Sequence, residues 1–190
     1  MTVSAPEPCP QPYDAVVLAG GRARRMGGAD KPALVVGRRT LLDSVLVAVA
    51  DAQTVVVVGP QRATCRPVTW AREDPPGGGP VAALAAALPL VTAGVVAVLA
   101  ADLPFLDATT VRALRRALER DGALLVDADG RDQLLVGVWR TQPLRQALSP
   151  FDARLGSVLG RLRADRVAVD GRPWFDCDTE EDVAVARRQA

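Results

Sequence analysis

The chain has 190 residues, of which 49% are hydrophobic and 24% charged, and its formal net charge is +1. These values are typical of an ordinary globular protein, and they give no global field that would attract nucleic acid or an acidic membrane surface. The chain has no histidine, which removes the commonest general base and the commonest transition-metal ligand.

The chain contains three cysteines, Cys9, Cys65 and Cys177, which are widely spaced. An odd number without a CxxC pair speaks against a disulfide framework or a zinc ribbon, so a reducing cytoplasm is the expected setting. The segment 80–101 contains no charged residue, which is a property of membrane-spanning helices. Pro89 and a Thr-Ala-Gly turn divide it, however, and we expect a helix, a turn and a buried strand.

The first half of the chain alternates strand and helix patterns. Three short runs rich in β-branched residues predict strands covered on both faces, at residues 15–18, 54–58 and 95–99. Apolar residues recur at helical spacing between and after them, at residues 40–50, 80–88 and 109–120. This alternation predicts an α/β fold with a single doubly wound, mostly parallel sheet.

The pattern changes after Gly122. The expected elements are strands at 123–126 and 134–139, helices at 143–148 and 153–162, and a strand at 166–169. Thr179 is a plausible N-cap for a last helix running to about Arg188, with acidic residues in its first turn. No repeat or linker is visible, so we expect one domain at 13–190. We expect residues 1–12 to form a flexible tail before it.

Three features are expected at one edge of this sheet, because ligands of α/β folds collect at the carboxyl ends of the strands. The first strand runs into Gly20 and Gly21, the segment after the second ends in a glycine-rich loop at 73–80, and the third is followed by Asp102. That carboxylate is well placed to bind Mg²⁺. The alternative for Asp102 is a simple turn aspartate, and for the loop at 73–80 a flexible connector.

The first loop has the parts of a phosphate cradle, namely glycines that let backbone N–H groups approach anionic oxygens and a cluster of cations. The cations are Arg22, Arg24, Arg25 and Lys31. The loop matches neither a Walker A nor a GxGxxG motif. A glycine turn with a solvated basic face is the alternative, although Lys31 is the only lysine beside 22 arginines.

Four motifs occur in order over nearly the whole chain. They are Leu-Ala-Gly-Gly-x-x-x-Arg-Met-Gly-Gly-x-Asp-Lys from Leu18, a Gly-Pro helix start, Asp-x-Pro from Asp102, and Asp-x-Asp-Thr-x-x-Asp from Asp176. In these the chain resembles the molybdenum cofactor guanylyltransferase (MobA) family of the MobA-like NTP transferase superfamily. The resemblance implies a Rossmann-like nucleotidyltransferase fold. Its Gly-Gly and Asp-Lys pairs favour the guanylyl branch over the related cytidylyltransferases.

The resemblance implies roles for particular residues. Arg25, Lys31 and Asp102 are the implied catalytic residues. Leu18, Ala19, Gly20, Gly21, Lys31, Asp74, Gly79 and Asp102 form the implied nucleotide site, with Asp74 near the guanine or ribose. Asp102, Asp176 and Asp178 are the implied metal ligands. The family usually has Asn-x-Asn-Thr where this chain has Asp-Cys-Asp-Thr, and an asparagine where this chain has Gly59.

The activity implied by the resemblance is transfer of GMP from GTP to the phosphate of Mo-molybdopterin, with Mg²⁺ and release of pyrophosphate. Transient contact with other cofactor-biosynthesis proteins or molybdoenzymes is also expected. The alternatives are a nucleotidyltransferase that uses CTP or another NTP with a different phosphorylated acceptor, and a non-catalytic nucleotide-binding domain. The acceptor side is the least defined, with candidate residues Asp129, Arg131, Asp132, Gln133, Arg154 and Arg161.

Overall fold

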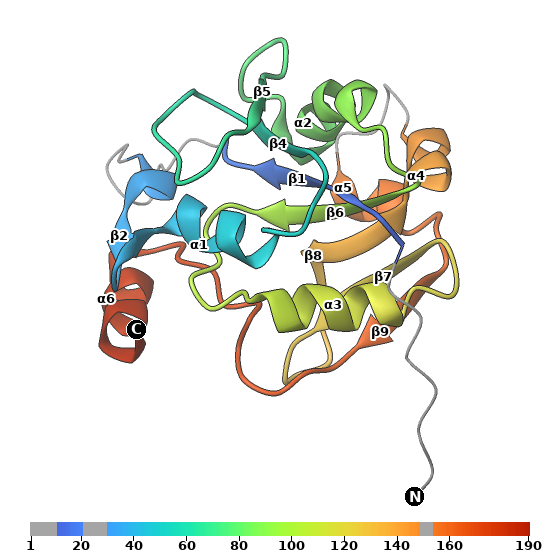
Figure 1. Ribbon diagram of the computed structural model, residues 1–190. Coiled ribbons are helices and arrows are strands. Elements are labelled where there is room, and N and C mark those ends of the chain that lie inside the picture. The colour runs from blue at the N-terminus through green and yellow to red at the C-terminus, as the bar shows by residue number, and fades with distance from the viewer. Residues whose placement is uncertain (1–10, 21–29, 149–153) are drawn as a thin grey trace, which may run out of the picture.

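The computed structural model describes residues 11–20, 30–148 and 154–190. Within these ranges the centre of the molecule is a seven-stranded sheet in the order β5-β4-β1-β6-β8-β7-β9 (Figure 1). The strands are β1 (Asp14–Leu18), β4 (Val55–Val58), β5 (Thr69–Ala71), β6 (Val95–Ala100), β7 (Gly122–Val126), β8 (Asp132–Arg140) and β9 (Ala164–Val167). In this sheet β8 runs against its neighbours and the other strands are parallel, so the predicted mostly parallel α/β fold is confirmed.

Helices cover both faces of the sheet. α1 (Leu41–Ala48) and α3 (Ala108–Arg116) pack on one face, and α2 (Gly79–Ala87), α4 (Thr141–Ala147) and α5 (Leu155–Leu159) pack on the other. α6 (Glu180–Gln189) lies beyond the edge of the sheet beside a small hairpin of β2 (Val35–Val36) and β3 (Arg39–Thr40) (Figure 1). Short 3₁₀ turns occupy Lys31–Ala33 (η2) and Leu88–Leu90 (η3).

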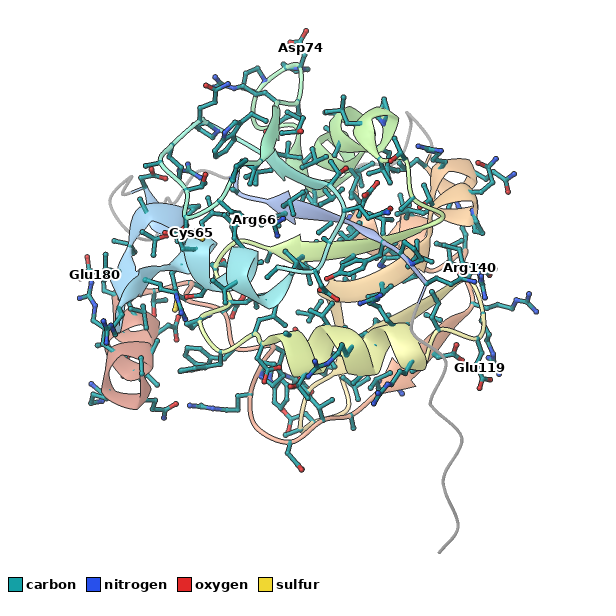
Figure 2. All side chains as sticks on the ribbon, in the orientation of Figure 1. Cys65, Arg66, Asp74, Glu119, Arg140 and Glu180 are labelled. Atoms are coloured by element: carbon teal, nitrogen blue, oxygen red, sulfur yellow. The ribbon has the colours of Figure 1, made fainter. Side chains whose placement is uncertain are left out.

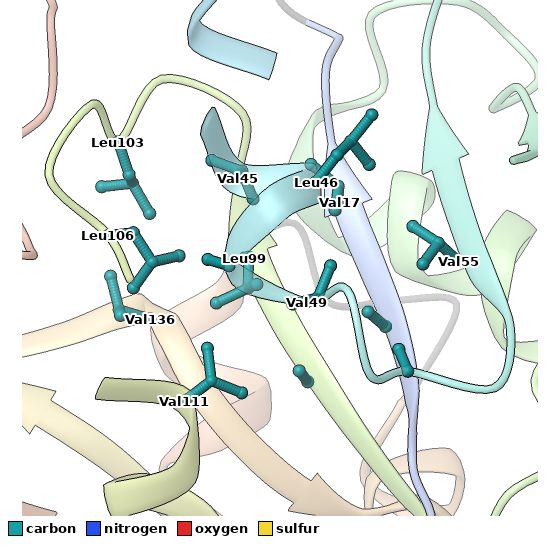
Figure 3. Close-up of a cluster of buried hydrophobic side chains, with 14 of the residues drawn as sticks. Val17, Val45, Leu46, Val49, Val55, Leu99, Leu103, Leu106, Val111 and Val136 are labelled. Atoms are coloured by element: carbon teal, nitrogen blue, oxygen red, sulfur yellow. The ribbon is translucent and has the colours of Figure 1, made fainter. Parts of the chain in front are cut away.

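The central strands are buried on both faces, as their continuous apolar sequences predict. In β1, Ala15 and Val17 face the α1/α3 layer, whereas Val16 faces the α2 layer. Figure 3 shows the first of these layers, where Val45 of α1 packs with Val17 and its neighbours. Burial of each such side chain contributes about 1.5–3 kcal/mol of hydrophobic free energy, so this packing holds the strands in one register.

That register brings several loops to one edge. Leu18 pairs with Val58 on one side and with Ala100 on the other, and Val58 pairs with Ala71. The parallel strands β1, β4, β5 and β6 therefore end at the same level. The arrows of β1 and β6 point toward the side where β2 and α6 lie (Figure 1).

Several boundaries differ from the expected ones for tertiary reasons. α3 ends at Arg116, not at residue 120, because the backbone amides of Glu119 and Arg120 donate to Oδ2 of Asp165. The predicted strand at 166–169 begins earlier, at Ala164, where it pairs with β7. The sequence patterns did not indicate β5 or the β2–β3 hairpin, which are only two or three residues per strand.

Two other local predictions are confirmed. Thr179 caps α6 through a capping box, in which its side chain accepts from the backbone of Asp182 and the Asp182 carboxylate accepts in return. The uncharged segment 80–101 divides into a helix, a turn and a buried strand. In the described part of the chain, every helix is too short or too polar to cross a membrane.

Candidate active site

A cavity of about 420 Å³ opens at the carboxyl edge of the sheet, between the ends of β1 and β6 and the start of α2. Its lining is Leu18, Gly20, Glu73, Gly77, Gly79, Pro80, Ala83, Ala100, Asp102 and Leu135. Most of this surface is apolar or glycine backbone, and its acidic groups are Glu73 and Asp102. A concave apolar site with a few polar groups suits a small molecule with a planar apolar part and a charged part.

Of the residues that sequence reasoning assigned to the nucleotide, the structure places Leu18, Gly20, Gly79 and Asp102 on the cavity wall. Ala19 is buried beside them, and its amide donates to Val58 O at 2.8 Å. Gly21 and Arg25 lie outside the described residues.

Lys31 lies between two of the predicted carboxylates. Its Nζ forms an ion pair with Oδ2 of Asp102 and lies 2.6 Å from Oδ1 of Asp178. Burial lowers the pKa of this ammonium, but attraction and hydrogen bonds to the two carboxylates outweigh the burial and raise the pKa overall. The ammonium is therefore charged at neutral pH, as a contact to phosphate requires.

The C-terminal segment is held against the end of β6. The amide of Cys177 donates to the carbonyl of Asp102 at 3.2 Å, which brings the flanking Asp176 and Asp178 to this edge. Partial desolvation raises the pKa of Asp176, and the like charges of Asp178 and Asp102 raise it further. A cluster of this kind attracts a cation.

Asp102 has the features of a ligand for a hard cation. Its Oδ1 is buried and accepts no hydrogen bond from the described residues, beside a cavity large enough for phosphates. Mg²⁺ favours one or two carboxylates, with waters and substrate phosphates completing its shell. No group of three His, Cys, Asp or Glu side chains in the described ranges is arranged to hold a metal without substrate. The residues thus fit a metal bound jointly by Asp102 and a nucleotide.

Asp74 and its neighbour Glu73 lie in different surroundings. Asp74 is exposed at the tip of the loop after β5 and is absent from the described cavity wall (Figure 2). The buried carboxylate is Glu73, 8% exposed, whose Oε1 accepts from the amide of Gly77 at 3.0 Å. Sequence reasoning did not single out Glu73, because β5, the short strand that precedes it, was not predicted.

Arg62 is a second residue that the sequence did not indicate. Its guanidinium, 11% exposed as a side chain, forms a forked pair with Asp30 at 2.8 and 3.2 Å. It also donates to the carbonyl of Ala19 at 3.3 Å. Ala19 and Asp30 stand near the two ends of the glycine- and arginine-rich segment, so Arg62 ties both flanks of that segment to the loop after β4.

Gly59 follows β4 where the resemblance would place an asparagine. Its φ of +146° is unfavourable for other residues, and a Cβ at this position would lie 2.7 Å from the carbonyl oxygen of Ala19. The glycine lets the ends of β1 and β4 approach closely. A side chain therefore does not fit here unless the start of the first loop shifts.

The candidates for the acceptor side are not part of this cavity wall. Asp132 pairs with Arg166 at 2.7 Å, and Arg161 donates to the carbonyl of Ala147 at 3.0 Å. Arg154 is exposed at the N-cap position of α5. Asp132 and Arg161 thus have structural partners.

The fold is shared with solved α/β nucleotidyltransferases. A molybdopterin-guanine dinucleotide biosynthesis protein A from Archaeoglobus fulgidus superposes with a TM-score of 0.71 at 20% identity, covering 93% of this chain and 97% of that one. A 2-C-methyl-D-erythritol 4-phosphate cytidylyltransferase from Thermus thermophilus gives 0.66 at 21% identity, covering 92% and 96%. At these identities the likeness shows the fold, which enzymes using different nucleotides share.

The sequence comparisons are more specific. The MobA-like NTP transferase domain matches residues 15–167. A molybdenum cofactor guanylyltransferase from Bradyrhizobium sp. (strain ORS 278) is 34% identical, covering 92% of both chains. Another from Nitrobacter hamburgensis is 32% identical, covering 100% of this chain and 98% of that one. The chain belongs to the MobA-like NTP transferase family and is a nucleotidyltransferase.

Proposed function

We propose that this protein is a molybdenum cofactor guanylyltransferase, which transfers GMP from GTP to the phosphate of Mo-molybdopterin and releases pyrophosphate. The observation that carries the proposal is the pairing of Lys31 with Asp102, which follows β6 and lines the cavity of about 420 Å³. The relatives that cover nearly the whole chain bear this activity in their names.

The chemistry needs positioning and charge neutralisation more than acid–base catalysis. An oxygen of the molybdopterin phosphate attacks the α-phosphorus of GTP, a new P–O bond forms, and the bond to the β-phosphate oxygen breaks. The nucleophile is already anionic, so a histidine-free chain can support the step. Lys31 neutralises charge on the phosphates, and its carboxylate partners hold its ammonium in place.

Asp102 is the residue proposed to hold Mg²⁺, through its buried and unpartnered Oδ1. When bound, the ion supplies neutralisation of the phosphate oxygens as the pyrophosphate leaves. Asp176 and Asp178 remain proposed ligands, although Asp178 already pairs with Lys31. A nucleotide that binds Lys31 competes with these carboxylates, which frees them toward the ion.

The setting of the reaction is proposed to be the cytoplasm, with GTP and Mo-molybdopterin as substrates. Cys65 and Cys177 are both free thiols, which suits a reducing compartment. Transient contact with the enzymes that supply or receive the cofactor is also proposed, because the product is handed on to other proteins.

The test of the proposal is transfer of labelled GMP from GTP to a molybdopterin acceptor in the presence of Mg²⁺. We expect Asp102→Ala to lower the rate by about 10²–10³-fold, since it removes an electrostatic contact of the transition state. Asp170→Ala is the matched control, because Asp170 is an exposed carboxylate away from the cavity wall. An Asp102→Ala protein with full activity would remove the metal-binding role.

The competing function is transfer from CTP or another nucleotide to a different phosphorylated acceptor. This candidate is retained because the Thermus thermophilus cytidylyltransferase shares the fold. Melting curves with GTP, CTP, UTP and ATP in Mg²⁺ separate the two, because a ligand raises the melting temperature according to its affinity. A larger shift with CTP than with GTP would exclude the guanylyl assignment.

A further inference from the structure

A second cavity, of about 440 Å³, lies under α5, and the proposed phosphate chemistry does not use it. It is formed on β7, β8 and β9, which continue the sheet beyond β6 (Figure 1). Leucines supply most of its apolar wall, among them Leu124, Leu134 and Leu159. Gly156 and Gly160 face it without side chains, which leaves room beneath the helix. A cavity of this size and character suits a small molecule with a flat apolar part.

The two cavities lie side by side on the same face of the sheet. Leu135 lines the nucleotide cavity, and the adjacent Leu134 lines the second cavity. Consecutive strand residues normally point to opposite faces, yet both leucines pack in the layer of α2 and α5. The reason is a bulge in β8. Two consecutive residues of β7 pair with Gly137 and Gln133 of β8, so residues 134–136 have no partner in β7.

An ion pair lines the second cavity at the end farther from the nucleotide cavity. Asp132 belongs to β8 and Arg166 to β9, the edge strand, and Nε of Arg166 donates to Oδ1 of Asp132 at 2.7 Å. Oδ2 of Asp132 accepts no hydrogen bond from the described residues. Arg166 also donates to the carbonyl of Gly130 and has further N–H groups. The pair therefore offers hydrogen-bond acceptors next to donors on the wall of an apolar cavity.

We propose that this second cavity binds the pterin of the acceptor and that the Asp132–Arg166 pair recognises its aminopyrimidinone edge. The inference rests on the proposed function and deepens it. This edge of a pterin presents the N3–H and 2-amino donors next to the 4-carbonyl, which complements a carboxylate beside a guanidinium. The phosphate of molybdopterin is at the opposite end of the molecule. It therefore points past Leu134 and Leu135 toward the nucleotide cavity, where it meets the α-phosphorus of GTP.

The competing role for the ion pair is purely structural, as a link between β8 and β9. Its side chains are 46% and 55% exposed, and most ion pairs of this kind bind nothing. Asp132→Asn separates the two roles, because the asparagine carbonyl still accepts from Arg166 while its amide opposes the donors of the pterin. Asp129→Asn is the control, since it makes the same change at an exposed carboxylate that does not line the cavity.

The experiment measures the binding of 6-hydroxymethylpterin phosphate, which has the same ring edge and a phosphate on a short arm, by fluorescence anisotropy. The nucleotide site is first filled with α,β-methylene-GTP and Mg²⁺, which keeps the pterin out of it and cannot donate GMP. The second ligand is the corresponding lumazine, in which a carbonyl replaces the 2-amino group. We expect the wild-type protein and Asp129→Asn to bind the pterin at least about tenfold more tightly than the lumazine, because a carboxylate repels that carbonyl.

Asp132→Asn is expected to bind the pterin about tenfold more weakly and to bind the two ligands equally, since it loses the charged acceptor. Its melting temperature without ligand should match that of the wild type. If Asp132→Asn does not fold, the preference of the wild type for the pterin and the cavity-filling variant below still decide between the two roles.

Gly156→Leu tests the cavity independently of the ion pair. A Cβ at this position meets one neighbour, Cδ1 of Leu134, at an ordinary contact distance of 3.6 Å, so a side chain fits and occupies the cavity. We expect the KM for Mo-molybdopterin in GMP transfer to rise at least about tenfold and the KM for GTP to stay unchanged. Ser157→Leu, at an exposed position of the same helix that does not line the cavity, is the control.

The outcomes distinguish this inference from the function on which it rests. Equal binding of the pterin and the lumazine by the wild type, an unchanged preference in Asp132→Asn, or an unchanged KM for Mo-molybdopterin in Gly156→Leu overturns the pterin site alone. A protein that transfers GMP to Mo-molybdopterin but does not bind the pterin phosphate has the same consequence. A wild-type protein that binds no GTP analogue and transfers no GMP overturns both proposals.

Discussion

The Nζ of Lys31 lies 2.6 Å from Oδ1 of Asp178, although 147 positions separate the two residues. Lys31 begins the 3₁₀ turn η2, and Asp178 stands next to Thr179, the N-cap of α6. A further bond from Arg187 of α6 to the carbonyl of Val35 at 3.0 Å holds this helix to the hairpin. The last helix thus places one of the two carboxylates that orient the predicted phosphate-binding lysine.

Replacing Lys31 tests whether its charge acts on the substrate. We expect Lys31→Met to lower the rate of GMP transfer by about 10²–10³-fold, because no other charge in the described part of the chain is held between Asp102 and Asp178 to replace it. Steady-state transfer assays measure the effect. Arg188→Met, which removes an exposed cation from α6, should leave the rate unchanged. A Lys31→Met enzyme with wild-type rates would show that this ammonium serves structure only.

Arg62 is expected to position the first loop through its contacts with Asp30 and Ala19. We predict that Arg62→Gln weakens GTP binding, while the neighbouring Gln61→Ala, at a separate position in the same loop, leaves it unchanged. A double-mutant cycle with Asp30→Asn should give a coupling of about 0.5–1 kcal/mol in GTP binding, since Asp30 is half exposed and the pair is partly screened. Additive effects of the two changes would contradict a shared role.

Gly59→Asn restores the asparagine that the family resemblance suggests, yet we expect it to destabilise the protein. The new Cβ would lie 2.7 Å from Ala19 O at a positive φ, and the cost is about 1–3 kcal/mol of unfolding free energy. Urea denaturation measures it. Gly94→Asn is the control, because a Cβ there meets nothing within 4 Å. Equal stability of the two variants would mean that the loop after β1 shifts at little cost in free energy.

A buried tyrosine network at the opposite edge of the sheet predicts a pH dependence of stability. Asp51 accepts from the Tyr13 hydroxyl at 2.5 Å and pairs with Arg115 at 2.8 Å. Partial burial raises the pKa of Asp51, but these partners outweigh it and lower the pKa below its ordinary 3.8. The contribution of Asp51 to stability is therefore complete above about pH 4, and it is lost as pH falls through the lowered pKa.

Asp51→Asn should accordingly destabilise the protein at pH 7 by less than about 1 kcal/mol, because the carboxylate is half exposed and screened. The difference from the wild type should shrink as the pH is lowered below about 4. Chemical denaturation at several pH values measures both quantities. Asp170→Asn, at an exposed site, should show little difference at any pH, and a constant gap for Asp51→Asn would contradict the assignment.

The sequence alone was sufficient to predict the strands that bury apolar residues on both faces of the sheet. Runs such as Val55–Val58 have no amphipathic pattern, so a strand covered on two faces is the structure that accommodates them. Elements of two or three residues carry too little pattern to be recognised. β5 is one of these, and without it the sequence did not show that Glu73 is buried while Asp74 is exposed.

The residue types at the site could be predicted without a structure, because a glycine-rich loop, a single lysine and an aspartate after a buried strand are local features of the sequence. The helix cap at Thr179 is local as well, since it depends on the residue three positions later. The contacts that these side chains make could not be predicted from the local sequence. The pairing of Lys31 with Asp178, the clamp formed by Arg62 and the burial of Glu73 depend on strand register and on the packing of α6, which only the tertiary structure decides, because these contacts join segments far apart in the chain.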